Sequence, residues 1–128
     1  TTEQKDVARV VKGEAAQVEI FGEHMKGYAT SDPQKTVAVR RWLSANCFGD
    51  YYVRSGLTLQ ERELVTFCYL AGQGDTAPQL TGHVTANVRM GNSEEVLIAT
   101  CLQFPPLIGY PRTLNALAAV ENAIHPKK

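Results

Sequence analysis

Two titratable side chains in the middle of this chain have the chemistry for proton transfer. Glu63 falls in the second turn of a predicted helix, and the spacing turns it toward the apolar side of that helix. A buried carboxylate costs several kcal/mol unless it is paired, so a residue in this position needs a partner or a function. As a structural residue, Glu63 would pair with an arginine. The candidate partners are Arg54, Arg62 and Arg89.

His83 is the second candidate, about one turn into the next predicted helix. It shares a side of that helix with Asn87 and lies away from the apolar stripe that begins at Leu80. An imidazole can act near neutral pH as a base or as a hydrogen-bond partner. A lone histidine is also often structural, and the sequence leaves both readings open. His24 and His125 lie among polar or terminal residues and have weaker claims.

The three cysteines form no recognisable metal or disulfide motif. Cys47, Cys68 and Cys101 are odd in number and widely spaced, and each lies inside a helical pattern rather than in a CxxC or CxxH cluster. Free cysteine is among the most buried residue types, and a reactive thiol needs an electropositive neighbour. We therefore expect reduced, buried thiols and no metal site.

Composition limits the possible classes of protein. With 128 residues and 44% hydrophobic content, the chain is expected to form one domain over residues 1–128. Thirteen basic and thirteen acidic residues give no net charge, which argues against a nucleic-acid-binding protein. No apolar run approaches the ~20 residues of a membrane span, and the first residues lack the apolar segment of a signal peptide. These features predict a soluble, cytoplasmic protein.

Helix start and stop signals predict an all-α fold of about six helices, since no strand-like alternation appears. The pattern over 3–26 predicts one or two helices, with Gly13 and Gly22 as interruptions. Residues 31–33 read as a start signal, Ser-Asp-Pro, for a helix that continues to about Arg54.

The second half of the chain has clearer boundaries. The expected order is a helix from the capping box at 58–61 to about Gly72, a loop to Pro78, a helix ending at Gly91, a helix opening at Ser93 and ending at Pro105-Pro106, and a last helix from Pro111. Residues 64–71 and 96–104 are apolar around most of the helix circumference, so they need cover on several sides. In a chain this short, that need predicts a homo-oligomer with a helical interface.

Several of these segments together resemble the carboxymuconolactone decarboxylase family over about residues 42–123. They are the run 48–66 with its Arg-Glu pair, Leu80-x-x-His83-x-x-x-Asn87, Gly91-x-Ser-Glu-Glu and Gly109-Tyr-Pro111. The resemblance implies an alkylhydroperoxidase D-like helical fold that assembles into rings, often homotrimers or homohexamers. Pro105-Pro106 departs from the pattern of the relatives.

The same superfamily contains thiol peroxidases that carry a Cys-x-x-Cys-x-x-x-His motif. The histidine of that motif matches His83, but its cysteine positions fall at Thr76 and Gln79. A dithiol must supply both the attacking thiolate and the resolving group, so the disulfide mechanism is not carried over. A thiol peroxidase and a non-catalytic oligomeric protein that binds small acids are kept as alternatives.

The family name implies an unsaturated lactone acid as substrate. Loss of CO2 leaves a carbanion that the conjugated lactone carbonyl accepts as a dienolate, so neither an organic cofactor nor a metal is expected. For this reaction, His83 is the candidate group that polarises the lactone carbonyl or donates the proton, and Glu63 is the candidate that orients or reprotonates it. A guanidinium suits bidentate recognition of the substrate's carboxylates. The candidate substrate-binding residues are Arg54, Arg62, Arg89 and Tyr110.

Overall fold

The computed structural model describes residues 1–31 and 35–128 and divides into two compact units, Thr1–Leu57 and Thr58–Lys128. The fold is all-helical as predicted, and the described residues contain no strand. None of the helices in these residues has the length and apolar content needed to cross a membrane. The organisation as one domain stays a prediction.

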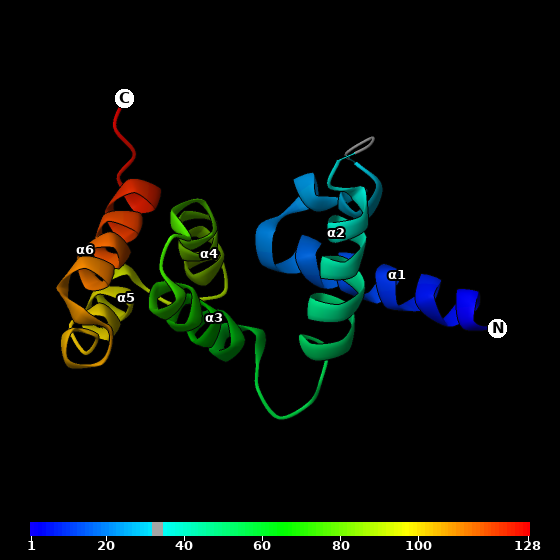
Figure 1. Ribbon diagram of the computed structural model, residues 1–128, viewed down its shortest axis with the longest axis horizontal. Helices are drawn as coiled ribbons and strands as arrows, with labels where there is room; N and C mark the ends of the chain where they lie inside the picture. The colour runs from blue at the N-terminus through cyan, green and yellow to red at the C-terminus, as the bar shows by residue number, and fades with distance from the viewer. Residues whose placement is uncertain (32–34) are drawn as a thin grey trace. The chain divides into compact units, whose positions relative to one another are not determined.

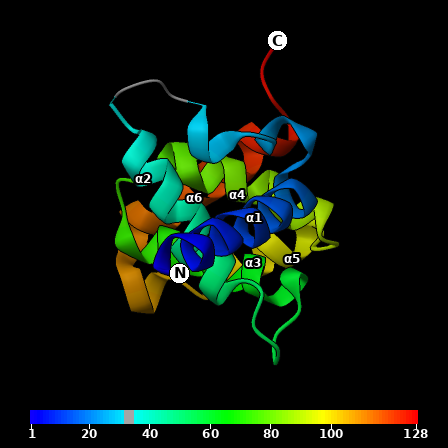
Figure 2. The ribbon, with the colours of Figure 1, turned by 90° about the vertical axis from the view of Figure 1, so that its right-hand side faces the viewer.

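The N-terminal unit contains one long helix and a second helical rod (Figure 1). Its elements are α1 (Thr2–Phe21), the short 3-10 helices η1 (Glu23–Met25) and η2 (Tyr28–Thr30), α2 (Val37–Trp42) and the π-helix η3 (Leu43–Tyr51). In both whole-chain views, α2 runs directly into η3, and α1 lies beside this rod (Figure 2). Of the predicted start signal at 31–33, residues 32 and 33 lie outside the described residues.

Backbone contact between α1 and η3 corrects the predicted interruption at Gly13. The helix α1 runs through this residue without a break. A Cβ atom at Gly13 would lie 1.6 Å from the carbonyl oxygen of Ser44, and one at Gly49 would lie 2.3 Å from that of Arg9. The two helices therefore touch where neither has a side chain. The Ser44 hydroxyl adds a buried hydrogen bond of 2.6 Å to Oε1 of Gln17.

The rod that follows Val37 is wound differently from the prediction. The sequence predicts one α-helix to about Arg54, whereas nine residues, Leu43–Tyr51, adopt a π-helix. The Tyr52 amide accordingly donates to the carbonyl of Cys47, five residues back. Hydrophobic periodicity cannot distinguish an α-helix from a π-helix over so short a stretch. The π-helical segment is the part of the rod that packs most closely against α1.

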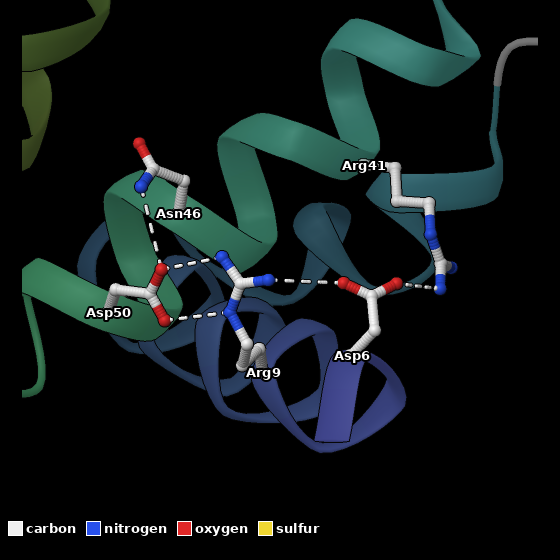
Figure 3. Close-up of polar contacts among 5 residues, drawn as sticks. All are labelled: Asp6, Arg9, Arg41, Asn46 and Asp50. Carbon is white, nitrogen blue, oxygen red and sulfur yellow. Dashed lines mark hydrogen bonds and ion pairs between the residues drawn. The ribbon is translucent and has the colours of Figure 1, made fainter. Parts of the chain in front are cut away.

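A chain of charged side chains joins α1 to the rod (Figure 3). The Arg9 guanidinium donates to both carboxylate oxygens of Asp50, at 2.8 and 2.6 Å, and to Asp6 at 3.2 Å. Arg41 donates to the other oxygen of Asp6 at 2.6 Å, and Asn46 donates to Asp50 at 3.4 Å. The Arg9 hydrogen bond lowers the pKa of Asp50 from its usual value of 3.8. These side chains are partly exposed, so the network connects α1 with the rod at the surface of the unit.

The C-terminal unit packs four helices around one apolar core. Its helices are α3 (Leu59–Gln73), α4 (Ala77–Arg89), α5 (Glu94–Cys101) and α6 (Pro105–Ile124). Helix α4 contacts both α3 and α6, and α5 lies against α6 (Figure 1). The buried core consists of Phe67, Ala71, Leu80, Val84, Leu97, Cys101, Phe104, Ala116, Ala119 and Val120.

The predicted capping signals of this unit are confirmed. The Thr58 hydroxyl accepts from the Glu61 amide at 3.1 Å, and the Glu61 carboxylate accepts from the Thr58 amide at 2.8 Å. Ser93 caps α5 by accepting from the Val96 amide, and Gly91 has the expected positive φ of 103°. The capping box fixes where α3 begins, and so fixes which face each of its residues occupies.

The proline pair before the last helix has a different role from the one predicted. Helix α5 already ends at Cys101, and Pro105 begins α6, because proline is tolerated in the first turn of a helix. Gly109 then interrupts α6 with a φ of 82°, two residues before Pro111, where the sequence predicts a start. A short helical turn, 105–108, is therefore added before the predicted helix.

Candidate functional site

The structure brings Glu63 and His83 together across the contact between α3 and α4. The Glu63 side chain is fully buried, and that of His83 is 15% exposed. Nδ1 of the imidazole lies 2.7 Å from Oε2 of the carboxylate. Helix α4 buries Leu80 and Val84 in the core, and this anchoring turns His83 toward the inner face of α3. Both side chains thus come from rigid helices.

The geometry of this pair defines what it can do chemically. With Glu63 ionised, Nδ1–H donates a charge-assisted hydrogen bond, which is short and strong in a water-poor site. This contact orients the ring and selects the neutral tautomer that carries its proton on Nδ1. A proton exchanged with a bound molecule would therefore pass through Nε2. The carboxylate would stabilise the imidazolium form in which that nitrogen carries a proton.

Two buried amides that the sequence left without a role hold the pair in place. Nδ2 of Asn87 donates to the carbonyl of Glu63 at 3.0 Å and to that of His83 at 2.7 Å. Its Oδ1 accepts from Asn92, which also donates to the carbonyl of Gln60 at 2.9 Å. One amide therefore connects the backbones of both members of the pair. The sequence signal that could have identified this role of Asn87 is its position one helical turn after His83.

The predicted substrate-binding residues differ in how far they are buried and in the unit to which they belong. Arg62 is half-buried and directly precedes Glu63 in the sequence. Consecutive residues of a helix do not face each other, so this adjacency does not bring the two side chains together. Arg89, in the last turn of α4, is exposed. Tyr110, next to the Gly109 break, is 73% exposed. Arg54 belongs to the N-terminal unit, where its guanidinium lies 4.5 Å from the centre of the Tyr51 ring.

Cys68 and Cys101 lack the environment of reactive cysteines. Burial, with a smaller effect from Cys68, raises the pKa of Cys101 to about 11, and burial also raises the pKa of Cys68. At the position of the first peroxidase cysteine, the Thr76 hydroxyl donates to the carbonyl of Leu70 at 2.7 Å. An activated thiolate needs the opposite environment, in which its pKa is lowered.

An open, mostly apolar groove of about 620 Å³ runs along α3, and neither Glu63 nor His83 lines it. It is lined by Leu64, Val65, Cys68, Tyr69, Gly72, Gln73 and Thr100. Elsewhere in the unit, side-chain ligand atoms of Glu94, Glu121 and His125 lie within 4.8 Å of one another. There Nε2 of His125 lies 2.9 Å from Oε1 of Glu94 in a partly exposed contact.

Comparisons with known proteins place the chain in a family. No curated protein matches the chain. The sequence model of the carboxymuconolactone decarboxylase family matches residues 38–122, which include Glu63, His83 and Asn87. Since this match extends over well more than half of the sequence, the chain belongs to the carboxymuconolactone decarboxylase family.

Proposed function

We propose that this protein is a cofactor-independent carboxy-lyase that acts on an unsaturated lactone acid similar to carboxymuconolactone. Family membership supports a general decarboxylase or alkylhydroperoxidase-like role. The observation that carries the finer proposal is the 2.7 Å contact between buried Glu63 and His83. A carboxylate and an imidazole at this distance can orient and deliver a single proton.

The proposed reaction breaks the bond between the ring carbon and the departing carboxylate, which leaves as CO2. The electron pair moves into the conjugated lactone carbonyl and forms a dienolate, so the substrate serves as its own electron sink. Nε2–H of His83 then protonates carbon, and the histidine regains a proton from water. Glu63 keeps the second proton on the imidazolium until the dienolate forms, and the imidazolium charge stabilises the negative charge that develops on the dienolate.

Recognition of the dianionic substrate is assigned to arginines. Arg62 and Arg89 are the candidates in the C-terminal unit, and Tyr110 is the candidate for a pocket wall. Each guanidinium offers paired donors that match a carboxylate.

We also propose self-association into a homotrimer or homohexamer. Helices α3 and α5 expose large apolar side chains that a soluble monomer would normally cover. These side chains are Val65, Tyr69, Val96 and Ile98, and Leu102, directly after α5, is exposed as well. Light scattering should give a mass three or six times that of the chain, and Tyr69→Lys should lower it. A wild-type monomer at micromolar concentration would contradict this part of the proposal.

The catalytic proposal is tested by following lactone absorbance with wild type, His83→Ala and Glu63→Gln. We expect both variants to lower kcat about 100- to 10,000-fold, the usual contribution of general acid–base catalysis. His24→Ala is the matched control, because it removes an exposed histidine from the other unit. Circular dichroism establishes whether each variant stays folded. Full activity in folded His83→Ala would refute the mechanism.

The thiol-peroxidase alternative requires a reactive cysteine, so the reactivity of the thiols tests it. If burial keeps Cys101 at a pKa of about 11, only about 0.1% of this thiol is ionised at pH 8. Iodoacetamide should therefore modify Cys101 far more slowly than free cysteine, and the rate should rise about tenfold per pH unit up to about pH 11. Peroxide consumption by an enzyme inactive on lactones, lost on alkylation, would favour the peroxidase. Saturable binding of a small acid without turnover would favour the non-catalytic alternative.

A further inference from the structure

A second pocket in the C-terminal unit lies apart from the Glu63–His83 site. It has a volume of about 240 Å³ and lies where the end of α3, the start of α4 and one face of α6 meet. Its floor is apolar and includes Ala71 and Leu80, which belong to the buried core. Neither Glu63 nor His83 lines it, so the pocket is independent of the proposed lactone chemistry.

Arg112 is the main cationic group of this pocket. Its side chain crosses directly over Gly74, because a Cβ atom at that glycine would lie 2.7 Å from Nε and 3.6 Å from Cζ of the guanidinium. Gly74 also has a φ of 73°, a conformation that glycine adopts at little cost. Because Gly74 has no side chain, the Arg112 guanidinium can lie directly over the backbone at this side of the pocket.

Asp75 supplies an opposite charge to the same pocket, and the two charges do not neutralise each other. Neither Arg112 nor Asp75 has a hydrogen bond or an ion pair to any side chain within the described part of the chain. The same holds for the side-chain amides of Asn115 and Asn122, which line the α6 wall. The pocket therefore presents a cation, an anion and two amides with their hydrogen-bonding capacity unused.

This pattern selects one class of ligand. A phosphate or a dicarboxylate would be attracted by Arg112 but repelled by Asp75, and a simple amine would meet the reverse situation. A molecule with one carboxylate and one ammonium group satisfies both. A volume of 240 Å³ holds about eight waters, which suits a molecule of six to ten heavy atoms.

We propose that this pocket binds a small free amino acid, with its carboxylate on the Arg112 guanidinium and its ammonium group on the Asp75 carboxylate. The short side chain would lie on the apolar floor beside Ala71 and Leu80. Asn115 and Asn122 would supply hydrogen bonds to the same ligand. The N-terminus of α4, at Ala77, adds a favourable dipole for the carboxylate.

The test is an NMR titration of the full chain with L-alanine, monitored through backbone amide shifts. We expect saturable shifts confined to residues 71–81 and 112–122. Arg112→Gln and Asp75→Asn should each weaken binding about tenfold or more, since each removes a charge-assisted contact. Both residues are exposed, so neither substitution is expected to unfold the unit.

Matched controls separate specific recognition from general charge effects. Lys127→Gln removes the same charge as Arg112→Gln, but from the exposed tail, and should leave alanine binding unchanged. L-lactate lacks the ammonium group and ethylamine lacks the carboxylate, so each should bind at least about tenfold more weakly than alanine. The proposal fails if alanine gives no saturable shifts, if lactate binds equally well, or if Lys127→Gln has the effect of Arg112→Gln.

Discussion

The two units of this chain use charged side chains in contrasting ways. In the N-terminal unit, Arg9 and Asp50 form a bidentate ion pair whose side chains are 41% and 29% exposed. In the C-terminal unit, Glu63 is fully buried and lies 2.7 Å from His83. The Arg9–Asp50 pair remains partly exposed to solvent, whereas burial removes most of the water around the Glu63–His83 pair.

The difference separates structural charges from candidates for chemistry. Partly exposed pairs contribute little to stability, so the N-terminal unit depends mainly on the close contact of α1 with η3. A buried carboxylate is costly to desolvate, and an apolar pair of similar size would often be as stable. The buried position of Glu63 therefore supports a role of this carboxylate in function rather than in stabilising the fold.

The largest expected effect comes from breaking the glycine contact in the N-terminal unit. Gly13→Ala would place a methyl carbon 1.6 Å from the carbonyl oxygen of Ser44, and no side-chain rotation can relieve a clash with backbone. We expect a loss of at least ~4 kcal/mol of stability, the range of the most disruptive single substitutions. Thermal unfolding followed by circular dichroism measures it.

Gly82→Ala sharpens that comparison, because the same substitution in the other unit meets no atom within 4 Å. Gly82 lies inside α4 without a positive φ, so alanine should stabilise the helix by up to ~1 kcal/mol. Equal destabilisation by the two substitutions would show that backbone contact with η3 does not hold α1.

A smaller effect is expected from Asn87→Leu, which keeps the volume of the side chain but removes its amide. The carbonyls of Glu63 and His83 each lose a donor, and Asn92 loses an acceptor. We expect a stability loss of about 1–3 kcal/mol, the cost of leaving buried polar groups unsatisfied. Urea unfolding gives this value.

The same variant tests whether Asn87 positions the proposed catalytic pair. If it does, the ¹⁵N shifts of the His83 imidazole should change, and kcat should fall more than KM rises. A stability loss that leaves the imidazole shifts at their wild-type values would reduce Asn87 to a purely structural residue.

The smallest effect is expected from Arg9→Gln in the exposed network. The Arg9 hydrogen bond lowers the folded-state pKa of Asp50, so its stabilisation is present above the usual value of 3.8 and is lost as pH falls through the lowered value. The difference in melting temperature between wild type and Arg9→Gln should therefore be small near pH 7 and vanish near pH 2. A difference that grows on acidification would contradict this assignment, and added salt should reduce the difference at neutral pH.

The sequence predicted the C-terminal unit better than the N-terminal unit. Capping residues at Thr58 and Ser93 and the positive φ of Gly91 act locally, so their effects can be read from neighbouring residues. Gly13 looked like a helix interruption, because a glycine lowers helix propensity whatever it packs against. Its contact with Ser44 joins residues far apart in the sequence, and no local rule contains it.

By itself, the sequence determined the all-helical class, the start of α3 and hence the buried position of Glu63. Only the tertiary structure decided that His83 is the partner of this carboxylate, that Asn87 connects the two backbones, and that Arg112 lies over Gly74 beside Asp75. Local signals fix where a helix begins and which face is apolar. The partner of a buried polar group is set by how separate helices pack, because this packing brings together side chains that are distant along the chain.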